Sequence, residues 1–438
     1  MEMDDFKQRR LEREKQRQAR LRQQRMLTIK LLIALVVLIA VAITILVVAS
    51  GRKPVEVPPE GTTTLSTETE TTETESTAET TTPTEAALVE NTKDKTVITF
   101  AAAGDLNITD NVVASGGDNY DYTKTFMDVL PLLSQADLTA INIEGNFIGA
   151  PYGTETASAP NQLLSALGKM GVDLVQVANS YTIKNGVSGM HSTIQTIRGA
   201  GFETMGAYLD QSDFNKTGGY TIRKIQGVKV AVVAFTKGMS SMTLPVGAES
   251  CVNLLYEDYA TAYQKTDTDG ITKILRAVAK EKPDITIALV HWGSEFNDTH
   301  SKSQEKIRSL LLAEGVDAII GTHPHYVQEI IYDEAAGTLV AYSLGDFISD
   351  GTKSGTEYSI VLELEITKDR KAERTYISGY KYTPIFTISD EETLRVVRME
   401  QAIADYEAKY LGRVSKETYD AMVYAGDRVK ARVTPKTE

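Results

Sequence analysis

Three of the five histidines in this sequence lie in two short motifs in its last third. His291 directly follows an apolar run at 285–290, and His323 and His325 follow a second run at 318–320. Runs of this length are typical of buried parallel strands, and open α/β sheets bind ligands at the carboxyl ends of such strands. Because imidazole is a common metal ligand, strands that deliver imidazoles to one edge predict a metal site.

Oxygen-bearing side chains end three further apolar runs, at Asp105, Glu144 and Asn179. Taken singly, such a residue is more typical of a turn or a helix cap, and a lone histidine is more typical of a hydrogen-bonded core or surface group. Together, oxygen ligands and imidazoles suit Mn, Fe or Zn, and a pair of such ions can clamp a phosphoryl group and activate water. The sequence therefore predicts a site for one or two divalent ions.

Hydrophobic periodicity predicts the elements that position these residues. The expected strands are 97–103, 138–143, 173–178, 220–225, 228–235, 285–290, 318–320, 326–332, 338–343, 359–367 and 374–381. The expected helices are 163–170, 191–200, 271–280, 304–314, 391–410 and 416–430. Strand–helix alternation followed by β-hairpins indicates a mixed α/β layer domain over residues 95–390. We expect residues 391–438 to form a helical appendage that docks its apolar positions on this domain.

The start of the sequence predicts a membrane anchor. Residues 1–30 contain ten Lys and Arg against five acids, and residues 31–49 contain no charge. At about 1.5 Å per residue, such a helix spans the roughly 30 Å hydrocarbon core. A cleaved signal peptide is the alternative, but its apolar core is only about 7–15 residues long. We therefore expect a transmembrane helix at 31–50 in the cell membrane, a basic cytoplasmic tail at 1–30, and a single-pass protein whose C-terminal domain is extracytoplasmic.

The composition predicts a linker and argues against both a disulfide-stapled scaffold and a nucleic-acid partner. Residues 54–92, the bulk of a segment at 51–94, are rich in Thr and Glu and contain no Lys or Arg, which predicts a disordered tether. Cys251 is the only cysteine, so the chain is not a disulfide-stapled scaffold. The net charge is −13 and no basic stripe interrupts the globular part, which argues against nucleic acid as a partner.

Six strings together resemble a known family. They are 100–105, 140–144, 178–179, 291–295, 321–325 and 342–347. In this order they are similar to the CapA-type poly-γ-glutamate synthesis (capsule biosynthesis) proteins of the metallophosphoesterase, or calcineurin-like, superfamily, over roughly residues 96–385. The resemblance implies an α/β fold built as a four-layer α-β-β-α sandwich with a metal site at the strand ends. It also implies poly-γ-glutamate synthase or export subunits as partners.

The resemblance further implies a set of metal ligands. In the superfamily two ions share a carboxylate, here Glu144. The remaining implied ligands are Asn179, His291 and His323 for one ion, and Asp105 and His325 for the other. The histidine that the superfamily has two residues after its first Asp is Asn107 here, so the second ion has fewer ligands. Of these residues, Asp105, His291 and His325 are also candidate catalytic residues.

Three positions depart from the family pattern. Tyr181 stands where the family has a histidine, and it is our fourth catalytic candidate. With an ordinary pKa near 10, a tyrosine donates a hydrogen bond but is a poor acid at neutral pH. Lys184 replaces an Asp and either binds an anionic ligand or is a solvated loop residue. Asp346 replaces an Asn and either adds charge near the ions or caps a turn.

Trp292 and Glu295, which follow His291, are candidate substrate-binding residues, alongside Lys184 and Asp346. Trp292, the only tryptophan, either packs under the site or forms a platform for substrate. Glu295 is placed to orient a ligand or a histidine that binds the ion.

Two functions fit these residues. The first is a metal-dependent hydrolase-like protein acting on an anionic polymer or a phosphoester during poly-γ-glutamate synthesis or export. The alternative is a non-catalytic, metal-binding scaffold that holds polymer or partner subunits at the cell surface, which Tyr181 and Lys184 favour. Residues 93–438 are net negative and repel a polyanion at long range, so polymer binding requires a local positive pocket.

Overall fold

The computed structural model describes residues 94–389, 394–409 and 414–434. The predicted basic tail, transmembrane helix and almost all of the linker lie outside these residues. Within the part of the chain that the structure describes, no helix is both long enough and apolar enough to cross a membrane.

Among the described residues, eight strands form the first sheet, in the order β14-β13-β12-β1-β2-β3-β4, with β11 beside β1. They are β1 (Lys95–Asn107), β2 (Leu138–Glu144), β3 (Leu174–Gln176), β4 (Glu203–Met205), β11 (Asp346–Ile348), β12 (Tyr358–Asp369), β13 (Arg374–Ser389) and β14 (Leu394–Arg398). Strands β1 to β4 are parallel, whereas β12, β13 and β14 pair antiparallel, so the sheet is mixed.

The second sheet has the order β5-β6-β7-β8-β10-β9. Its strands are β5 (Tyr220–Ile225), β6 (Val228–Thr236), β7 (Ile285–His291), β8 (Ala318–Thr322), β9 (Ile330–Asp333) and β10 (Thr338–Ala341). The β5–β6 hairpin confirms its prediction, and β6, β7, β8 and β10 run parallel. Every residue of β7 and β8 is buried, because these central strands are covered on both faces.

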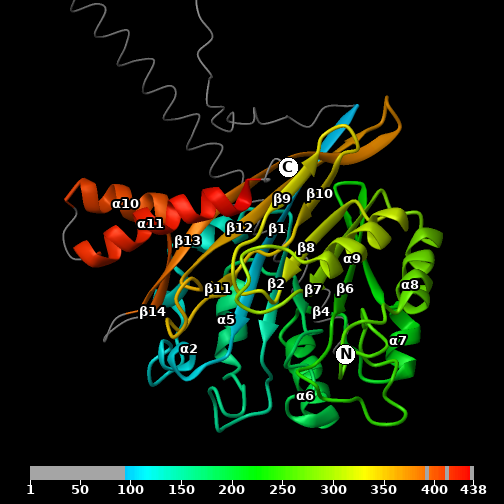
Figure 1. Cartoon of the computed structure of the whole chain (residues 1–438), viewed down its shortest axis with the longest axis horizontal. Coiled ribbons are helices and arrows are strands. Elements are labelled where there is room, and N and C mark those ends of the chain that lie inside the picture. Colours follow the sequence, from blue (N-terminus) through cyan, green and yellow to red (C-terminus); the bar gives the residue numbers. More distant parts are fainter. Residues whose placement is uncertain (1–93, 390–393, 410–413, 435–438) are drawn as a thin grey trace, which may run out of the picture. The chain divides into compact units, whose positions relative to one another are not determined.

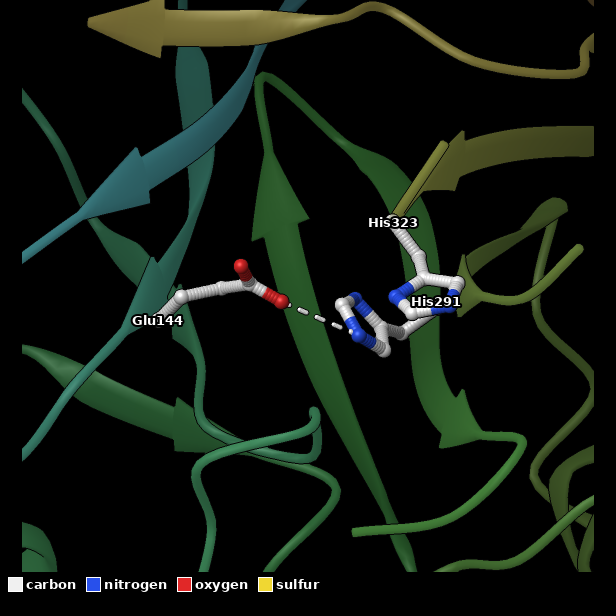
Figure 2. A group of neighbouring side chains, drawn as sticks. All are labelled: Glu144, His291 and His323. Atoms are coloured by element: carbon white, nitrogen blue, oxygen red, sulfur yellow. Dashed lines mark ion pairs between the residues drawn. The ribbon is translucent and has the colours of Figure 1, made fainter. Parts of the chain in front are cut away.

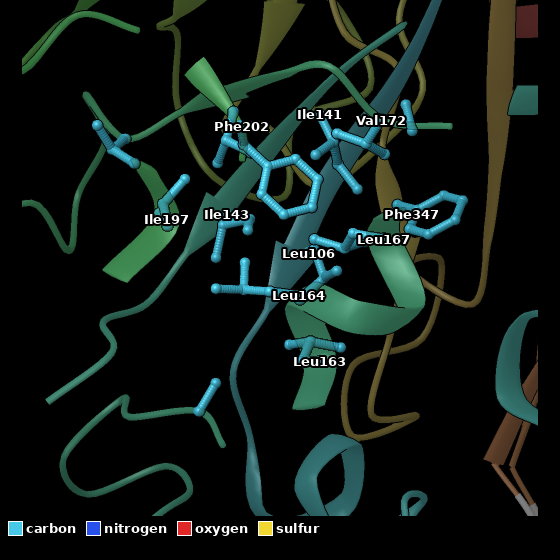
Figure 3. Packing of buried hydrophobic residues seen from close by; sticks show 14 of the residues in the cluster. Leu106, Ile141, Ile143, Leu163, Leu164, Leu167, Val172, Ile197, Phe202 and Phe347 are labelled. Carbon is cyan, nitrogen blue, oxygen red and sulfur yellow. The ribbon is translucent and has the colours of Figure 1, made fainter. Parts of the chain in front are cut away.

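The two sheets pack face to face and are covered by helices on their outer faces (Figure 1). Alternate residues of β1 and β6, such as Phe100 and Val230, point into one shared core. Helices α5 (Gln162–Lys169) and α6 (Gly186–Gly199) cover the outer face of the first sheet. Figure 3 shows Leu163, Leu164 and Leu167 of α5 against the side chains of β1 and β2.

The outer face of the second sheet carries α8 (Thr268–Lys280) and α9 (Lys302–Ala313). Helix α9 begins with a capping box between Ser301 and Gln304, in which each side chain meets the backbone N–H of the other residue. The two sheets and the helices on their outer faces confirm the α/β class.

The C-terminal segment differs in part from its prediction. A helix was expected from residue 391, whereas residues 394–398 form β14 and α10 (Met399–Glu407) begins after it. The reason is that Leu394 and Val396 face the core beneath the first sheet while Val397 faces the opposite core, which is strand periodicity. Helices α10 and α11 (Lys416–Val433) dock on β12 and β13, away from α8 and α9 (Figure 1).

Several short elements were not predicted from periodicity. They are β4, β11, α2 (Asp110–Ala114), α3 (Thr123–Phe126), α4 (Leu130–Ser134) and α7 (Gln211–Thr217). Each has at most seven residues, too few to establish a period. The strand expected at 326–332 is shorter than predicted, since only β9 forms there and Val327 makes an isolated bridge to Leu344.

Candidate metal centre

The carboxyl ends of strands from both sheets meet at one place. Asp105 lies near the end of β1 and Glu144 ends β2, while His291 ends β7 and His323 directly follows β8. The register of the parallel pairs aligns these ends, with Asn107 opposite Glu144. The predicted convergence of residues distant in sequence is therefore present.

Gly321, in one of the motifs, lies where the backbone of Tyr342 approaches closely. A Cβ on Gly321 would lie 2.0 Å from the carbonyl oxygen of Tyr342 and 2.5 Å from Nε1 of Trp292. Because neither atom can move without disturbing the core, only glycine fits directly before the His323 turn.

The contact between Glu144 and His291 is the main electrostatic feature of the site (Figure 2). Oε1 of Glu144 lies 3.0 Å from Nε2 of His291, but the geometry is not that of a hydrogen bond. Among the described residues, this buried carboxylate oxygen has no hydrogen-bond partner. The backbone N–H of Ser180 donates to the same Nε2 at 3.3 Å, which assigns the ring proton to Nδ1, 3.2 Å from Oγ1 of Thr322.

Oε1 of Glu144 therefore faces an imidazole nitrogen that carries no proton, and both residues are buried. Burial lowers the pKa of His291 to about 3, so its ring is neutral. Burial also raises the pKa of Glu144 to about 7, because the carboxylate has lost its hydration. A neutral imidazole with its second nitrogen held by a hydrogen bond, opposite an unpaired carboxylate oxygen, has the donor set and orientation of a metal site.

Three overlapping groups of side chains bring metal-binding atoms within 4.8 Å of one another. The groups are Glu144, His291 and His323; Glu295, His323 and His325; and Asp105, His325 and Asp346. All are buried except Glu295, which is exposed. These buried His, Glu and Asp groups fit divalent ions of the Mn, Fe and Zn type, since imidazole and carboxylate are their ordinary ligands.

The two histidines after β8 are held in an uncommon backbone conformation. His323 has φ of 92° and His325 has φ of 58°, both in the left-handed region. For residues other than glycine this costs about 1–3 kcal/mol each. The backbone N–H of His323 donates to Oδ2 of Asp105 at 2.9 Å, which ties the turn to the first sheet.

His325 lies in a group of three carboxylates. Its Nδ1 is 2.7 Å from Oδ1 of Asp346 and 3.7 Å from Oδ2 of Asp105, and its Nε2 is 3.9 Å from Oε2 of Glu144. Burial acts to lower the pKa of His325, but the charge and hydrogen bond of Asp346 and the charges of Glu144 and Asp105 outweigh it and raise that pKa well above 6.5. Burial raises the pKa of Asp346 to about 7. Asp346 therefore lies beside His325 and Asp105 in the candidate centre.

The structure places Asn179 beside the centre with its side chain hydrogen-bonded inside the protein. Its amide nitrogen donates to the Asn142 side chain at 3.0 Å and to the Ile143 carbonyl at 2.7 Å, and its Oδ1 accepts from the Tyr181 N–H at 2.9 Å. In this arrangement Asn179 supports Asn142, which in turn donates to Oδ1 of Asp105 at 2.6 Å.

Three residues at this centre were not predicted from the sequence. Asn142 is on the same face of β2 as Glu144, two residues earlier, so strand periodicity could have found it. Ser180 Oγ lies 3.1 Å from Nε2 of His291, directly after Asn179. Lys237 follows β6 and its Nζ lies 3.4 Å from Nε2 of His323. The rule that identified the other strand ends also applies to Lys237, since β6 pairs with β7.

Tyr181 and Lys184, which depart from the family pattern in the loop after Asn179, differ in burial. Tyr181 is half-buried, and burial followed by the negative charge of Glu144 raises its pKa to about 12. Its hydroxyl therefore stays protonated and is a donor near the centre. The Lys184 side chain is exposed, and its backbone N–H donates to the Tyr181 carbonyl at 3.0 Å, so the solvated-loop interpretation fits it better.

Trp292 does not form a substrate platform. Its indole is buried, stacks on Tyr342 and donates to the Tyr342 carbonyl at 2.8 Å. Packing against the second sheet therefore occupies both the ring and the N–H, which corrects the substrate-binding expectation. Glu295 is exposed at the rim, within reach of His323 and His325, as the sequence interpretation required.

Two solved structures match this chain at low sequence identity. The calcineurin-like phosphoesterase YfkN from Bacillus subtilis has a TM-score of 0.42 and 14% identity, and the match covers 76% of this chain and 98% of that one. A phosphatase from Mycoplasma pneumoniae has a TM-score of 0.42 and 13% identity, over 66% of this chain and 94% of that one.

Two curated relatives match this chain in sequence. The chain is 26% identical to the PGA biosynthesis protein CapA of Bacillus subtilis over 279 residues, which is 59% of this chain and 66% of the relative. It is 23% identical to the capsule biosynthesis protein CapA of Bacillus anthracis over 300 residues, which is 65% of this chain and 67% of the relative. The chain thus spans about two thirds of the length of these curated relatives. The bacterial capsule synthesis protein family PGA_cap matches residues 99–351, more than half of the 438 residues, and the chain therefore belongs to this family, as its motifs indicated.

Proposed function

We propose that this protein is a metal-dependent, hydrolase-like member of the machinery that makes or exports a poly-γ-glutamate capsule. The observation that carries the proposal is the buried pair of Glu144 and His291, in which a carboxylate oxygen without a hydrogen-bond partner lies 3.0 Å from a proton-free imidazole nitrogen, both of them ordinary metal-ligand atoms. The names of the two relatives, a PGA biosynthesis protein and a capsule biosynthesis protein, supply the pathway.

In this proposal the chain holds one or two divalent ions through its strand ends. Glu144, His291 and His323 hold the first ion, and Asp105 with His325 and Asp346 are available to the second. Bound there, the metal supplies an activated water and polarises the bond to be broken. The two sheets with a shared core and helices on both outer faces support a four-layer sandwich of the metallophosphoesterase type.

A second function, a non-catalytic scaffold, is favoured by one specific observation. The Tyr181 hydroxyl, with a pKa of about 12, is a poor acid for a leaving group at neutral pH, although it can donate a hydrogen bond to a bound anion. Such a weak acid suits a centre that binds a metal ion and an anion but hydrolyses the anion slowly. The two functions are separated by turnover, because both require the metal.

We also propose that the protein is anchored in the cell membrane by residues 31–50, with the metal centre outside and partner synthase or export subunits beside it. The uncharged run at 31–49 and its basic flank support this. Protease treatment of intact cells tests the orientation, since an extracytoplasmic domain is digested and a cytoplasmic one is protected.

Metal-dependent hydrolysis is the direct test of the first function. The full chain is assayed with Mn, Fe and Zn on an aryl phosphate and on a poly-γ-glutamate oligomer. His323→Ala removes a ligand of two of the three groups, and His191→Gln on α6 is the matched control outside them. Turnover that requires metal and is lost only in His323→Ala supports the hydrolase. A metal-loaded wild type without turnover on either substrate supports the scaffold.

A further inference from the structure

A buried arginine lies close to the metal centre but outside the family match. Arg432 is near the end of α11, and only 8% of its side chain is exposed. Its guanidinium lies over the rings of Tyr326 and Tyr358, 4.8 and 5.3 Å from their centroids. Among the described residues, its Nε and Nη1 have no hydrogen-bond partner. A buried guanidinium with two of its three nitrogens not hydrogen-bonded is costly even beside a carboxylate, which points to a function for its charge.

A second arginine of the same helix lies beside it in partial contact with solvent. Arg428 is one turn earlier on α11, and 42% of its side chain is exposed. Both arginines share a single counter-ion in Asp298, at 3.4 Å from Arg428 and 3.6 Å from Arg432. Because one carboxylate faces two guanidinium groups, the cluster keeps an excess positive charge.

A lysine extends this positive charge toward the histidines. Lys353 is exposed, and its Nζ lies 4.8 Å from the ring centroid of Phe296. Phe296 is itself 42% exposed and stacks on His325, with 5.4 Å between the ring centroids. Lys353 and His325 therefore both contact the Phe296 ring.

The arginines and the lysine are joined through one tyrosine. Tyr326 directly follows His325, and its ring contacts both Arg432 and Phe296. Its hydroxyl donates to the Ser354 carbonyl at 2.7 Å, which holds the loop that carries Lys353. The acidic groups nearby are Asp298, Glu357 and Glu295. Glu357 accepts from the Gly355 N–H, and Glu295 directly precedes Phe296 and is exposed at the rim of the centre.

We propose that Arg428, Arg432 and Lys353 form a carboxylate-binding subsite beside the metal centre, which receives an acidic polymer chain. Guanidinium groups match the planar, two-oxygen geometry of a carboxylate, and the exposed Phe296 ring offers an apolar surface for methylene groups. Arg428 and Lys353 contact the ligand, and Arg432 supplies charge from behind. All three residues lie beyond residue 351, where the family match ends, so the subsite is a feature of this chain's C-terminal part.

This inference rests on the proposed function and names its substrate class. The globular part of the chain is net negative, so a polyanion needs a local positive surface to bind. The subsite provides that surface next to the place where a bond of the polymer would be broken.

The test measures binding of a short poly-γ-glutamate oligomer to the full chain by calorimetry. Arg428→Gln and Lys353→Gln each remove one exposed charge, with little effect on folding. Arg276→Gln on α8 is the matched control, because its side chain is 72% exposed and pairs with Glu314 at 3.8 Å in the same way. Metal content and thermal unfolding are measured on the same samples, and polyphosphate serves as a second probe.

We expect Arg428→Gln and Lys353→Gln each to weaken oligomer binding about tenfold, the loss of one charge-assisted contact, and Arg276→Gln to leave it unchanged. Wild-type affinity in both subsite variants, or an equal loss in Arg276→Gln, overturns the subsite. Tighter binding of polyphosphate through the same two residues overturns the assignment to carboxylates. If the wild type holds no metal but still binds the oligomer through Arg428 and Lys353, the metal-dependent function fails while the subsite stands.

Discussion

Oε1 of Glu144 lies 3.0 Å from Nε2 of His291, with both atoms buried and no hydrogen bond between them. The two residues end strands of different sheets, so the contact exists only when β2 and β7 are in their final positions. A cation that binds both groups therefore stabilises the folded chain over the unfolded chain. Binding of a metal ion by these two residues would therefore be coupled to folding.

That coupling predicts thermal stabilisation by metal. Addition of Mn or Zn to chelator-treated protein raises the unfolding temperature, because the ion binds the folded state and relieves the repulsion between Glu144 and His291. Glu144→Gln removes the carboxylate charge, and in this variant the shift is largely lost. Differential scanning calorimetry measures both. An equal shift in wild type and Glu144→Gln contradicts the prediction.

Tyr181→His tests whether the proton donor limits the rate of metal-dependent turnover. The Tyr181 hydroxyl, with a pKa of about 12, is a poor acid, whereas an imidazole at this place titrates near neutral pH. We expect Tyr181→His to raise metal-dependent turnover of an aryl phosphate by about a hundredfold, the lower range for general acid catalysis.

The control for that comparison is Tyr181→Phe, which removes the hydroxyl and keeps the ring. Its turnover should stay within a few-fold of wild type, because the phenol does not transfer its proton. Unchanged turnover in Tyr181→His would show that the proton donor is not what limits the reaction.

Gly321→Ala is expected to destabilise the fold strongly. The added methyl meets the Tyr342 carbonyl at 2.0 Å and Trp292 Nε1 at 2.5 Å, both fixed in the core, at a cost of at least about 2 kcal/mol. Gly379→Ala is the matched control, since a methyl there has no atom within 4 Å. Urea unfolding of the two variants measures the difference, and equal midpoints would refute the close approach.

Asp317, which lies away from the metal centre, is expected to make the stability of the fold depend on pH. Burial raises its pKa from 3.8 to about 6, although its carboxylate accepts from the Thr286 N–H at 2.8 Å. Between these values the folded chain binds more protons than the unfolded chain, so stability falls as pH rises. The stability that the protonated group contributes is present below about pH 4 and lost above about pH 6.

Asp317→Asn therefore raises the free energy of unfolding at pH 7, by up to about 2 kcal/mol, and leaves it nearly unchanged at pH 4. Its amide oxygen still accepts the Thr286 hydrogen bond. Chemical unfolding at the two pH values checks the sign. A loss of stability at pH 7 contradicts the prediction.

Much of the fold and of the centre could be predicted because it depends on local pattern. Apolar runs ending in Glu144, His291 or His323 show both a strand and the end of that strand at which a ligand binds. The β5–β6 hairpin was predictable because Gln226 and Gly227 interrupt two alternating runs.

What could not be predicted depends on contacts between distant segments. The charged pattern after residue 390 is typical of a helix, but residues 394–398 pair with β13 and form a strand. The burial of Trp292 follows from the position of Tyr342, 50 residues away. The approach of α11 to Tyr326 and Phe296 is likewise set by tertiary packing, so the arginines of that helix gave no signal in the sequence.

The most direct test of the metal centre is elemental analysis of the full chain, purified without chelator and offered Mn, Fe and Zn. The structure predicts one or two bound equivalents in the wild type and in His191→Gln, and a loss of bound metal in the double variant His323→Ala, His325→Ala. A folded wild type that retains no ion, or a double variant that retains as much as the wild type, would contradict a metal centre formed by these strand ends.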